Sequence, residues 1–146
     1  MKFAEVVDPI DLEILDWPAS AREFLALEAA RYVSIEGSAV PQLRKEFSAD
    51  LVARRVGEAA LFSTVGGKVA TFRKTPELIE RLLPLLALDD WSIFHLNLHG
   101  ETAKLIEGYD WGEGCCPVSL AGDLAQFASH LVEARVARPW TEDAGE

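Results

Sequence analysis

The residues best suited to chemistry lie in the second half of the chain. They are two histidines, His95 and His99, an adjacent thiol pair, Cys115 and Cys116, and the carboxylate of Asp110. An imidazole beside a carboxylate can act as a general base. A thiolate is a nucleophile, and histidine with cysteine is a common set of zinc ligands. The spacing of these residues decides which of these chemistries is feasible.

The two histidines lie too far apart for a shared metal ion if they sit on a strand. Apolar residues alternate with polar ones around His95, which predicts a strand. On a strand His95 and His99 share a face but lie about 13 Å apart. His130 lies in the last predicted helix and could approach them. The face that carries His95 and Asn97 is mixed, which indicates a strand partly covered on both sides. We therefore predict no metal site.

An acid–base pair for hydrolysis could join His99 with Glu101 or Asp110. No nucleophile stands beside these residues, and such pairs arise by chance in a chain with 24 acidic residues. The sequence contains no phosphate-binding loop, no dinucleotide glycine motif, no nucleophile elbow and no His-Glu-x-x-His helix. We therefore predict no catalytic residue and no cofactor.

The adjacent thiols Cys115 and Cys116 cannot join distant segments by a disulfide. A reactive thiolate needs a nearby cation or helix N-terminus, and although a helix is predicted to start near Ser119, Glu113 and the overall acidity oppose ionisation. A free cysteine usually behaves as a small buried hydrophobic residue. The cysteine usage predicts a reducing, cytoplasmic location.

The segment from Tyr109 to Cys116 is the richest in the chain. It holds two aromatic residues, two acidic residues, two glycines and both thiols. Loops of this kind often carry function because a rigid scaffold positions them. We predict that the loop binds a protein partner through Tyr109, Asp110, Trp111 and Glu113. The alternative is that Tyr109 and Trp111 only cover the core.

The net charge of −10 is unevenly spread along the chain. An acidic surface repels phosphate groups, so we expect neither nucleic acid nor a membrane as partner. The same charge favours encounter with a basic protein, although it could also serve solubility alone. Basic side chains gather at Arg44, Lys45, Arg54 and Arg55. We expect them to pair within the fold, and contact with an acidic partner is the alternative.

The sequence predicts no membrane span and no secretory signal. No run reaches the roughly 18 apolar residues that cross a bilayer, and the longest apolar block, at 82–88, contains Pro84. The N-terminal residues become acidic at once, whereas a signal needs a basic start followed by an apolar run.

Five helices are predicted from apolar periodicity and capping signals. The spacing of the apolar residues within 8–16 predicts a short helix. Ser20 and Glu23 form a capping box for a helix whose apolar stripe runs to Val33. Repeats of four residues predict a helix within 41–56, with Ser48 as an alternative cap for a second short helix. Thr75, Pro76 and Glu77 begin another helix, which Pro84 ends or kinks, and Ser119 caps the last one.

Two hairpins complete the predicted fold. The first covers about 59–73 and turns at two glycines, and the second covers about 91–107 and turns at 99–101. We therefore predict the α+β class, with a mostly antiparallel sheet built from these hairpins and helices packed on one face. The sequence predicts a single domain over 1–138 and a flexible acidic tail over 139–146.

These observations favour a non-catalytic acidic domain that neutralises or regulates a basic protein partner. The composition, though no motif, resembles that of bacterial immunity proteins, which block toxins. The alternative is a small enzyme or ligand-binding domain that uses His95, His99, Cys115 or Asp110 beside the second hairpin. A structural subunit that forms a homo-oligomer is a third hypothesis.

Overall fold

The computed structural model of the 146-residue chain describes residue 6 and residues 9–52, 69–88, 90–101, 103–121 and 124–141. Within these residues the chain forms seven strands and four α-helices, joined by two 3₁₀ turns. In chain order the elements are β1 (Pro9–Ile14), α1 (Trp17–Ala26), β2 (Tyr32–Glu36), α2 (Val40–Glu46), η1 (Ser48–Asp50), β3 (Val69–Arg73), α4 (Pro76–Leu86), β4 (His95–His99), β5 (Lys104–Gly108), η3 (Asp110–Gly112), β6 (Cys115–Ser119), α5 (Leu124–Glu133) and β7 (Ala137–Pro139).

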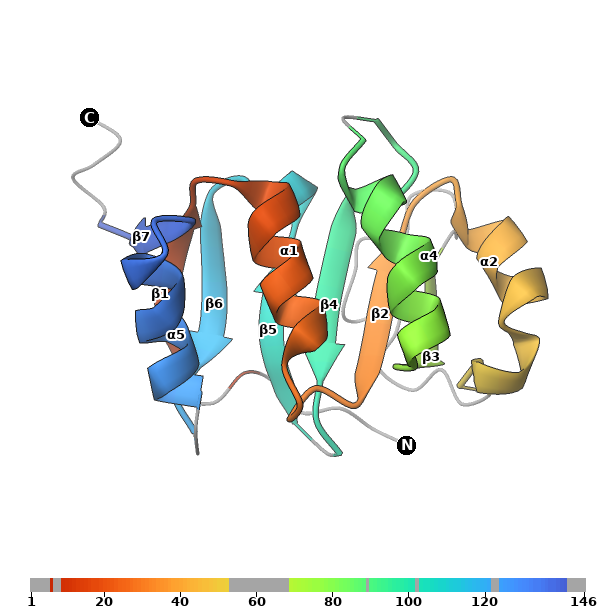
Figure 1. Cartoon of the computed structure of the whole chain (residues 1–146), viewed down its shortest axis with the longest axis horizontal. Coiled ribbons are helices and arrows are strands. Elements are labelled where there is room, and N and C mark those ends of the chain that lie inside the picture. The colour runs from red at the N-terminus through yellow and green to blue at the C-terminus, as the bar shows by residue number, and fades with distance from the viewer. Residues whose placement is uncertain are drawn as a thin grey trace.

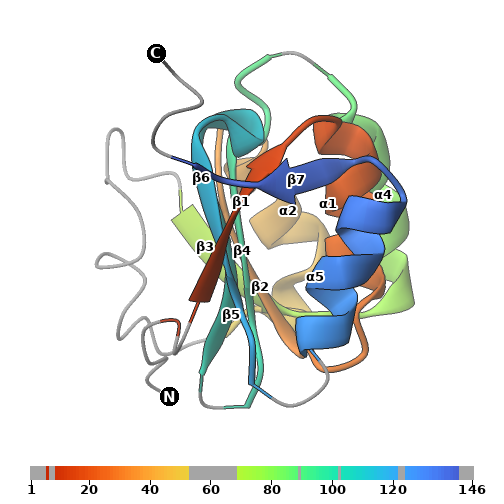
Figure 2. The same ribbon diagram turned by 90° about the vertical axis from the view of Figure 1, so that its left-hand side faces the viewer.

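The strands form one open antiparallel sheet in the order β3-β2-β4-β5-β6-β1-β7. All four α-helices cover the same face of this sheet, which stands nearly edge-on in Figure 2. Helices α1 and α4 lie side by side over its centre, and α5 covers the end that carries β1 and β7 (Figure 1). This arrangement confirms the predicted α+β class and the predicted one-sided helical layer.

The apolar core lies between the sheet and the helices. Alternate residues of each strand point into it, because successive side chains of a strand point to opposite faces. The fully buried core residues include Val33 and Ile35 of β2, Phe72 of β3, Leu96 and Leu98 of β4, Phe24 and Leu25 of α1, and Leu78 and Leu82 of α4.

The other face of the central strands is polar and buried as well. Every residue of β2 and β4 is buried, so both strands are covered on both sides, as predicted for the strand at His95. The buried polar residues of this layer are Ser34, Glu36, Thr71, His95, Asn97, His99 and Lys104. We call them the polar layer.

The second predicted hairpin is confirmed by the pairing of β4 with β5, although its first strand begins at His95 and not near residue 91. Its register shifts between Leu98 and His99, so that Lys104 lies opposite His99. Such a bulge re-aims side chains, and here it brings Lys104 to the polar layer. Of the first predicted hairpin, β3 matches the second strand, and the residues predicted as the first strand lie outside the described residues.

One predicted helix and the end of another are strands in the structure. Residues 9–14 form β1 and pair with β6, and residues 32–36 form β2 and pair with β3 and β4. The helix α1 begins after Asp16, whose carboxylate accepts the amide of Ala19, and it ends at Ala26. Ser20 is therefore not the cap, and its hydroxyl donates to the carbonyl of Val136. The spacing of apolar residues in these segments fits both the helical and the strand period. Pairing with distant strands makes the segments strands.

Three other boundaries differ from the predictions. Of the helix predicted within 41–56, the described residues up to 52 form α2, followed by the turn η1 at Ser48, and residues 53–56 lie outside the described residues. Helix α4 continues through Pro84 to Leu86, because a proline this close to the end removes few helical bonds. Ser119 ends β6 instead of capping a helix, and its hydroxyl accepts the amide of Ala121.

The predicted cap of α4 is confirmed, because the Thr75 hydroxyl accepts the Leu78 amide at 3.1 Å. We expect Thr75→Ala to lower the free energy of unfolding by about 1 kcal/mol, since a first-turn amide loses its acceptor. Thr75→Ser keeps the hydroxyl and should remain near wild type. Urea denaturation measures both changes, and equal stability of the two variants would contradict the capping role.

Candidate functional site

The most exposed aromatic group in the described part of the chain belongs to Trp91. Its side chain is 63% exposed, and its ring lies 4.9 Å from Phe94 and 5.0 Å from Trp111, both in edge-on contact. Three acidic residues, Asp90, Asp110 and Glu113, lie within two positions of Trp91 or Trp111 in the chain, and all three are exposed. We call these six residues the aromatic–acidic surface.

The backbone holds the two halves of the aromatic–acidic surface together. The Trp111 amide donates to the Phe94 carbonyl at 2.8 Å, and the Trp111 indole N–H donates to the Asp90 carbonyl at 2.8 Å. The turn η3 also places Asp110 and Trp111 at φ of 49° and 57°, in the left-handed region. Trp111 is thus fixed from two sides and supports the exposed ring of Trp91.

The loop beneath this surface rests on Trp17 of α1. A Cβ added at Gly112 would lie 2.5 Å from the Trp17 ring, and one added at Gly108 would lie 2.9 Å from it. Gly112 also has φ of +77°, which side chains other than glycine rarely adopt. Glycine at these positions therefore lets the loop approach the indole closely.

The four residues predicted to bind a partner do not all face outward. Asp110 and Glu113 are exposed, and Trp111 is half-buried with its ring in the surface cluster. Tyr109 is also half-buried, and its ring packs edge-on against His95 at 5.1 Å. Tyr109 thus faces inward at the site.

The sequence analysis missed the other half of the surface, at Asp90, Trp91 and Phe94. One signal was present, because residues 89–91 repeat the combination of acidic and aromatic residues found at 109–113. The contact itself joins positions 20 residues apart, and nothing local indicates it.

His95 lies directly under the surface and is almost fully buried. Its Nδ1 accepts the amide N–H of Asp110 at 2.9 Å and lies 3.0 Å from the Phe94 carbonyl. An amide can only donate, so Nδ1 carries no proton and the Phe94 contact is not a hydrogen bond. The proton of the neutral ring then lies on Nε2, which is 3.9 Å from Glu36 Oε1. Burial lowers the pKa of His95 and favours this neutral form.

Glu36 is the buried carboxylate of the site, with 1% of its surface exposed. Burial raises the pKa of Glu36, and the negative charge of Asp110 raises it further. Among the described residues, no group donates a hydrogen bond to either of its carboxylate oxygens. His95 and Glu36 therefore do not form a hydrogen-bonded ion pair.

His99 belongs to a separate hydrogen-bonded group in the polar layer. Its Nε2 lies 2.8 Å from the Ser34 hydroxyl, which lies 2.6 Å from the Thr71 hydroxyl. Burial lowers the pKa of His99 to about 3, and the positive charge of Lys104 contributes. An imidazole with this pKa is a weak base, so its position indicates a structural role.

The candidate chemical groups do not converge on one point. Cys116 faces the core from β6, and Cys115 lies beside Asp11 of β1. Burial raises the pKa of both thiols, that of Cys115 to about 11, so both are protonated at neutral pH. Within the described ranges, no three His, Cys, Asp or Glu side chains are arranged to hold a metal ion.

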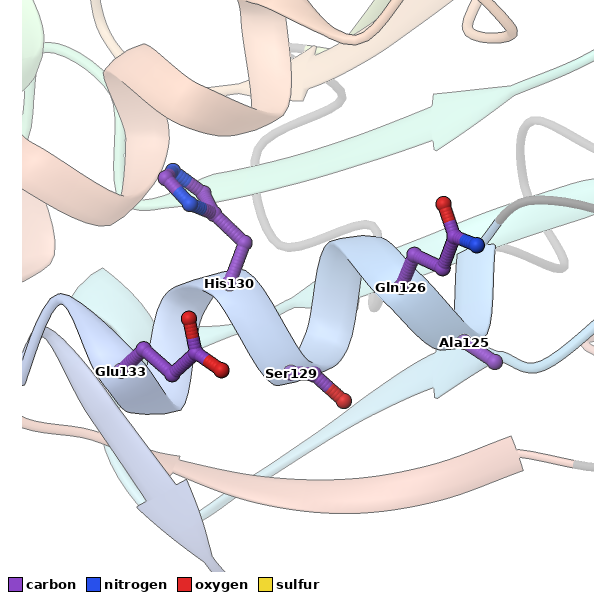
Figure 3. A pocket seen from close by; sticks show the side chains of 5 residues that line it. All are labelled: Ala125, Gln126, Ser129, His130 and Glu133. Carbon is purple, nitrogen blue, oxygen red and sulfur yellow. The ribbon is translucent and has the colours of Figure 1, made fainter.

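A shallow hollow of about 360 Å³ follows the outer side of α5. Figure 3 shows that its polar side chains point in different directions along one helix, so they form no convergent site. His130 instead faces α1, where its Nε2 lies 3.3 Å from Glu23. His130 therefore does not approach His95 or His99.

The predicted basic strip is only partly described. The Arg44 guanidinium donates to the Val69 carbonyl, which is a contact within the fold but not with an acidic side chain, and Lys45 is exposed. Arg54 and Arg55 lie outside the described residues.

Comparison with known proteins finds no family model, no curated protein and no solved structure that matches this chain. None of the described helices combines the length and the apolar composition that a membrane span requires.

Substitutions at two glycines with similar φ angles can distinguish the effect of backbone strain from the effect of packing against Trp17. Gly112 and Gly114 have φ of +77° and +73°, but only at Gly112 would a Cβ collide with Trp17. We expect Gly114→Ala to cost about 1 kcal/mol through backbone strain. Gly112→Ala should cost clearly more and alter the near-ultraviolet circular dichroism of the tryptophans. Equal losses in urea denaturation would show that the loop does not rest on Trp17.

The buried His99 predicts a loss of stability in mild acid. Its pKa is about 3 in the folded protein and 6.5 ordinarily, so below pH 6.5 only the unfolded chain binds this proton. The contribution of neutral His99 to stability is therefore fully present above pH 6.5 and is lost as the pH drops toward 3. Between pH 7.5 and 5.5 this group should remove roughly 1.4 kcal/mol from the free energy of unfolding.

His99→Gln isolates this contribution, because glutamine does not titrate and can still hydrogen bond to Ser34. Urea denaturation of both proteins at pH 7.5 and 5.5 should show a smaller acid loss in the variant by about that amount. Parallel losses in the two proteins would mean that His99 takes up its proton in the folded state.

Proposed function

We propose that this chain is a non-catalytic binding domain that docks its aromatic–acidic surface on a basic protein partner and thereby neutralises or regulates it. The observation that carries the proposal is the exposed ring of Trp91, which packs edge-on against Trp111 and is close in the chain to exposed acidic residues. An immunity-type protein that blocks a toxin would act in this way.

The aromatic part of the surface supports a strong contact. Tryptophan is among the residues that most often dominate binding energy, because a large rigid ring leaves water on contact. The Trp111 ring is already held by its indole hydrogen bond to the Asp90 carbonyl, so little side-chain freedom is lost when a partner binds.

The acidic part supports both the choice of partner and the rate of encounter. Asp90, Asp110 and Glu113 are exposed and adjoin the two tryptophans in the chain, and the whole chain carries a net charge of −10. Complementary charge speeds association and selects against acidic surfaces. A partner that presents lysine and arginine side chains around an apolar pocket fits this surface.

The other candidate groups support a binding role more than a catalytic one. His99 is buried and neutral, and both thiols are protonated at neutral pH. His95 uses Nδ1 to accept the Asp110 amide, which positions the loop. Of these groups, His95 supports the surface, whereas His99 lies at the other end of β4 and both thiols lie on β6.

The proposal is tested with the proteins encoded beside this gene as candidate partners. A partner should co-elute with the chain in gel filtration, and titration calorimetry should give a saturable affinity that weakens with salt. We expect Trp91→Ala to weaken binding about 30-fold or more, as truncation of a central aromatic anchor does. Asp110→Asn, which tolerates the same backbone angles, should mainly slow association.

Trp140→Ala is the matched control, because Trp140 is 37% exposed but follows β7 at the far edge of the sheet. It should bind like wild type. Two results would refute the proposed surface: no neighbouring gene product binds, or both tryptophan variants weaken binding equally.

A further inference from the structure

A small hollow lies at the opposite end of the sheet from the aromatic–acidic surface. It has a volume of about 190 Å³ and is lined by Arg31, Tyr32, Arg73, Lys74 and Glu101. Strand β2 begins beside the end of β4, where Tyr32 pairs with His99, and ends beside its start, where Glu36 pairs with His95. The hollow and the aromatic–acidic surface are thus separated by the length of these strands.

The backbone around this hollow is well fixed. The Arg31 amide donates to the His99 carbonyl at 2.7 Å, and the Lys74 amide donates to the Arg31 carbonyl at 2.9 Å. Tyr32 and Arg73 are paired across β2 and β3. The three cationic residues therefore start from strand ends whose relative positions are set by the sheet.

Three cationic residues line the hollow in a strongly acidic chain. Burial lowers the pKa of Lys74, and the positive charge of Arg31 lowers it further, so these two cations lie close together. The Lys74 ammonium donates to the Leu27 carbonyl, which orients it. Like charges held near one another favour the binding of an anion between them.

Among the described residues, the carboxylates near the hollow balance this charge only weakly. Arg31 and Glu101 approach to 3.9 Å, and the two side chains are 63% and 65% exposed. Exposed pairs at such a distance contribute little. Glu28 also acts on Lys74, but its effect is smaller than those of burial and of Arg31. An incoming anion can therefore compete with Glu101 for Arg31.

We propose that this hollow binds the phosphate group of a small molecule, through Arg31, Arg73 and Lys74. Phosphate carries up to two negative charges and several acceptor oxygens, which match two guanidinium forks and one ammonium. Tyr32 also lines the hollow. The ligand is either inorganic phosphate or a phosphate monoester, since both present the same group.

The test titrates the full-length protein at pH 7.5 with sodium phosphate and, separately, with glycerol phosphate. Sodium chloride at equal ionic strength is the reference, and calorimetry and the thermal unfolding midpoint are the readouts. We expect saturable binding and a higher midpoint with at least one phosphate probe. Equal affinity for both probes would assign the site to the phosphate group alone, and tighter binding of glycerol phosphate would assign it to a monoester.

Arg73→Gln and Arg31→Gln should each weaken phosphate binding at least tenfold. Arg22→Gln removes the same charge from the exposed side of α1 and should leave binding unchanged. If Arg73→Gln is misfolded by circular dichroism, the exposed Arg31 variant decides the question. The proposal is overturned if phosphate acts no differently from chloride, or if Arg22→Gln weakens binding as much as Arg73→Gln. Neither result bears on the aromatic–acidic surface.

Discussion

The structure depends on the pairing of β2 with β4, two central strands that are covered on both faces. Their inner faces are apolar and meet the helices, but their outer faces carry Ser34, Glu36, His95, Asn97 and His99. Buried polar groups are costly unless they find hydrogen-bond partners. Ser34 therefore lies between Thr71 and His99, and the Asn97 side chain accepts the Gly108 amide. Register along this pair is strongly specified, because a slip by one residue would move the polar side chains into the core.

Both ends of β4 lead from this polar layer to a candidate binding surface. At the start of the strand, His95 accepts the Asp110 amide and so holds the turn that carries Trp111 beneath Trp91. At its end, the His99 carbonyl accepts the Arg31 amide and so fixes one wall of the basic hollow. One strand thus positions an acidic, aromatic surface at one end of the sheet and a cationic hollow at the other. This separation keeps opposite charges apart within a chain of net charge −10.

The residues that first suggested chemistry serve mainly to build this scaffold. Burial favours the neutral forms of His95, His99 and both thiols. The candidate site was predictable in part, since Asp110, Trp111 and Glu113 were selected from the composition of one loop. Tyr109 faces inward, and Trp91 was missed, because the exposure of a side chain depends on which distant segment packs against it. The hollow lined by Arg31, Arg73 and Lys74 was missed as well, because Arg31 lies far along the chain from Arg73.

The sequence by itself determined the features that depend on near neighbours. These are the acidity, the α+β class, the hairpin of β4 with β5 and the Thr75 cap of α4, since alternation and capping are read within a few residues. Only the tertiary structure decided that residues 9–14 and 32–36 are strands, because their apolar spacing also fits a helix. They become strands by pairing with β6 and β4, whose residues lie more than 50 positions away. Such pairing is a property of the whole sheet, so no local pattern can specify it.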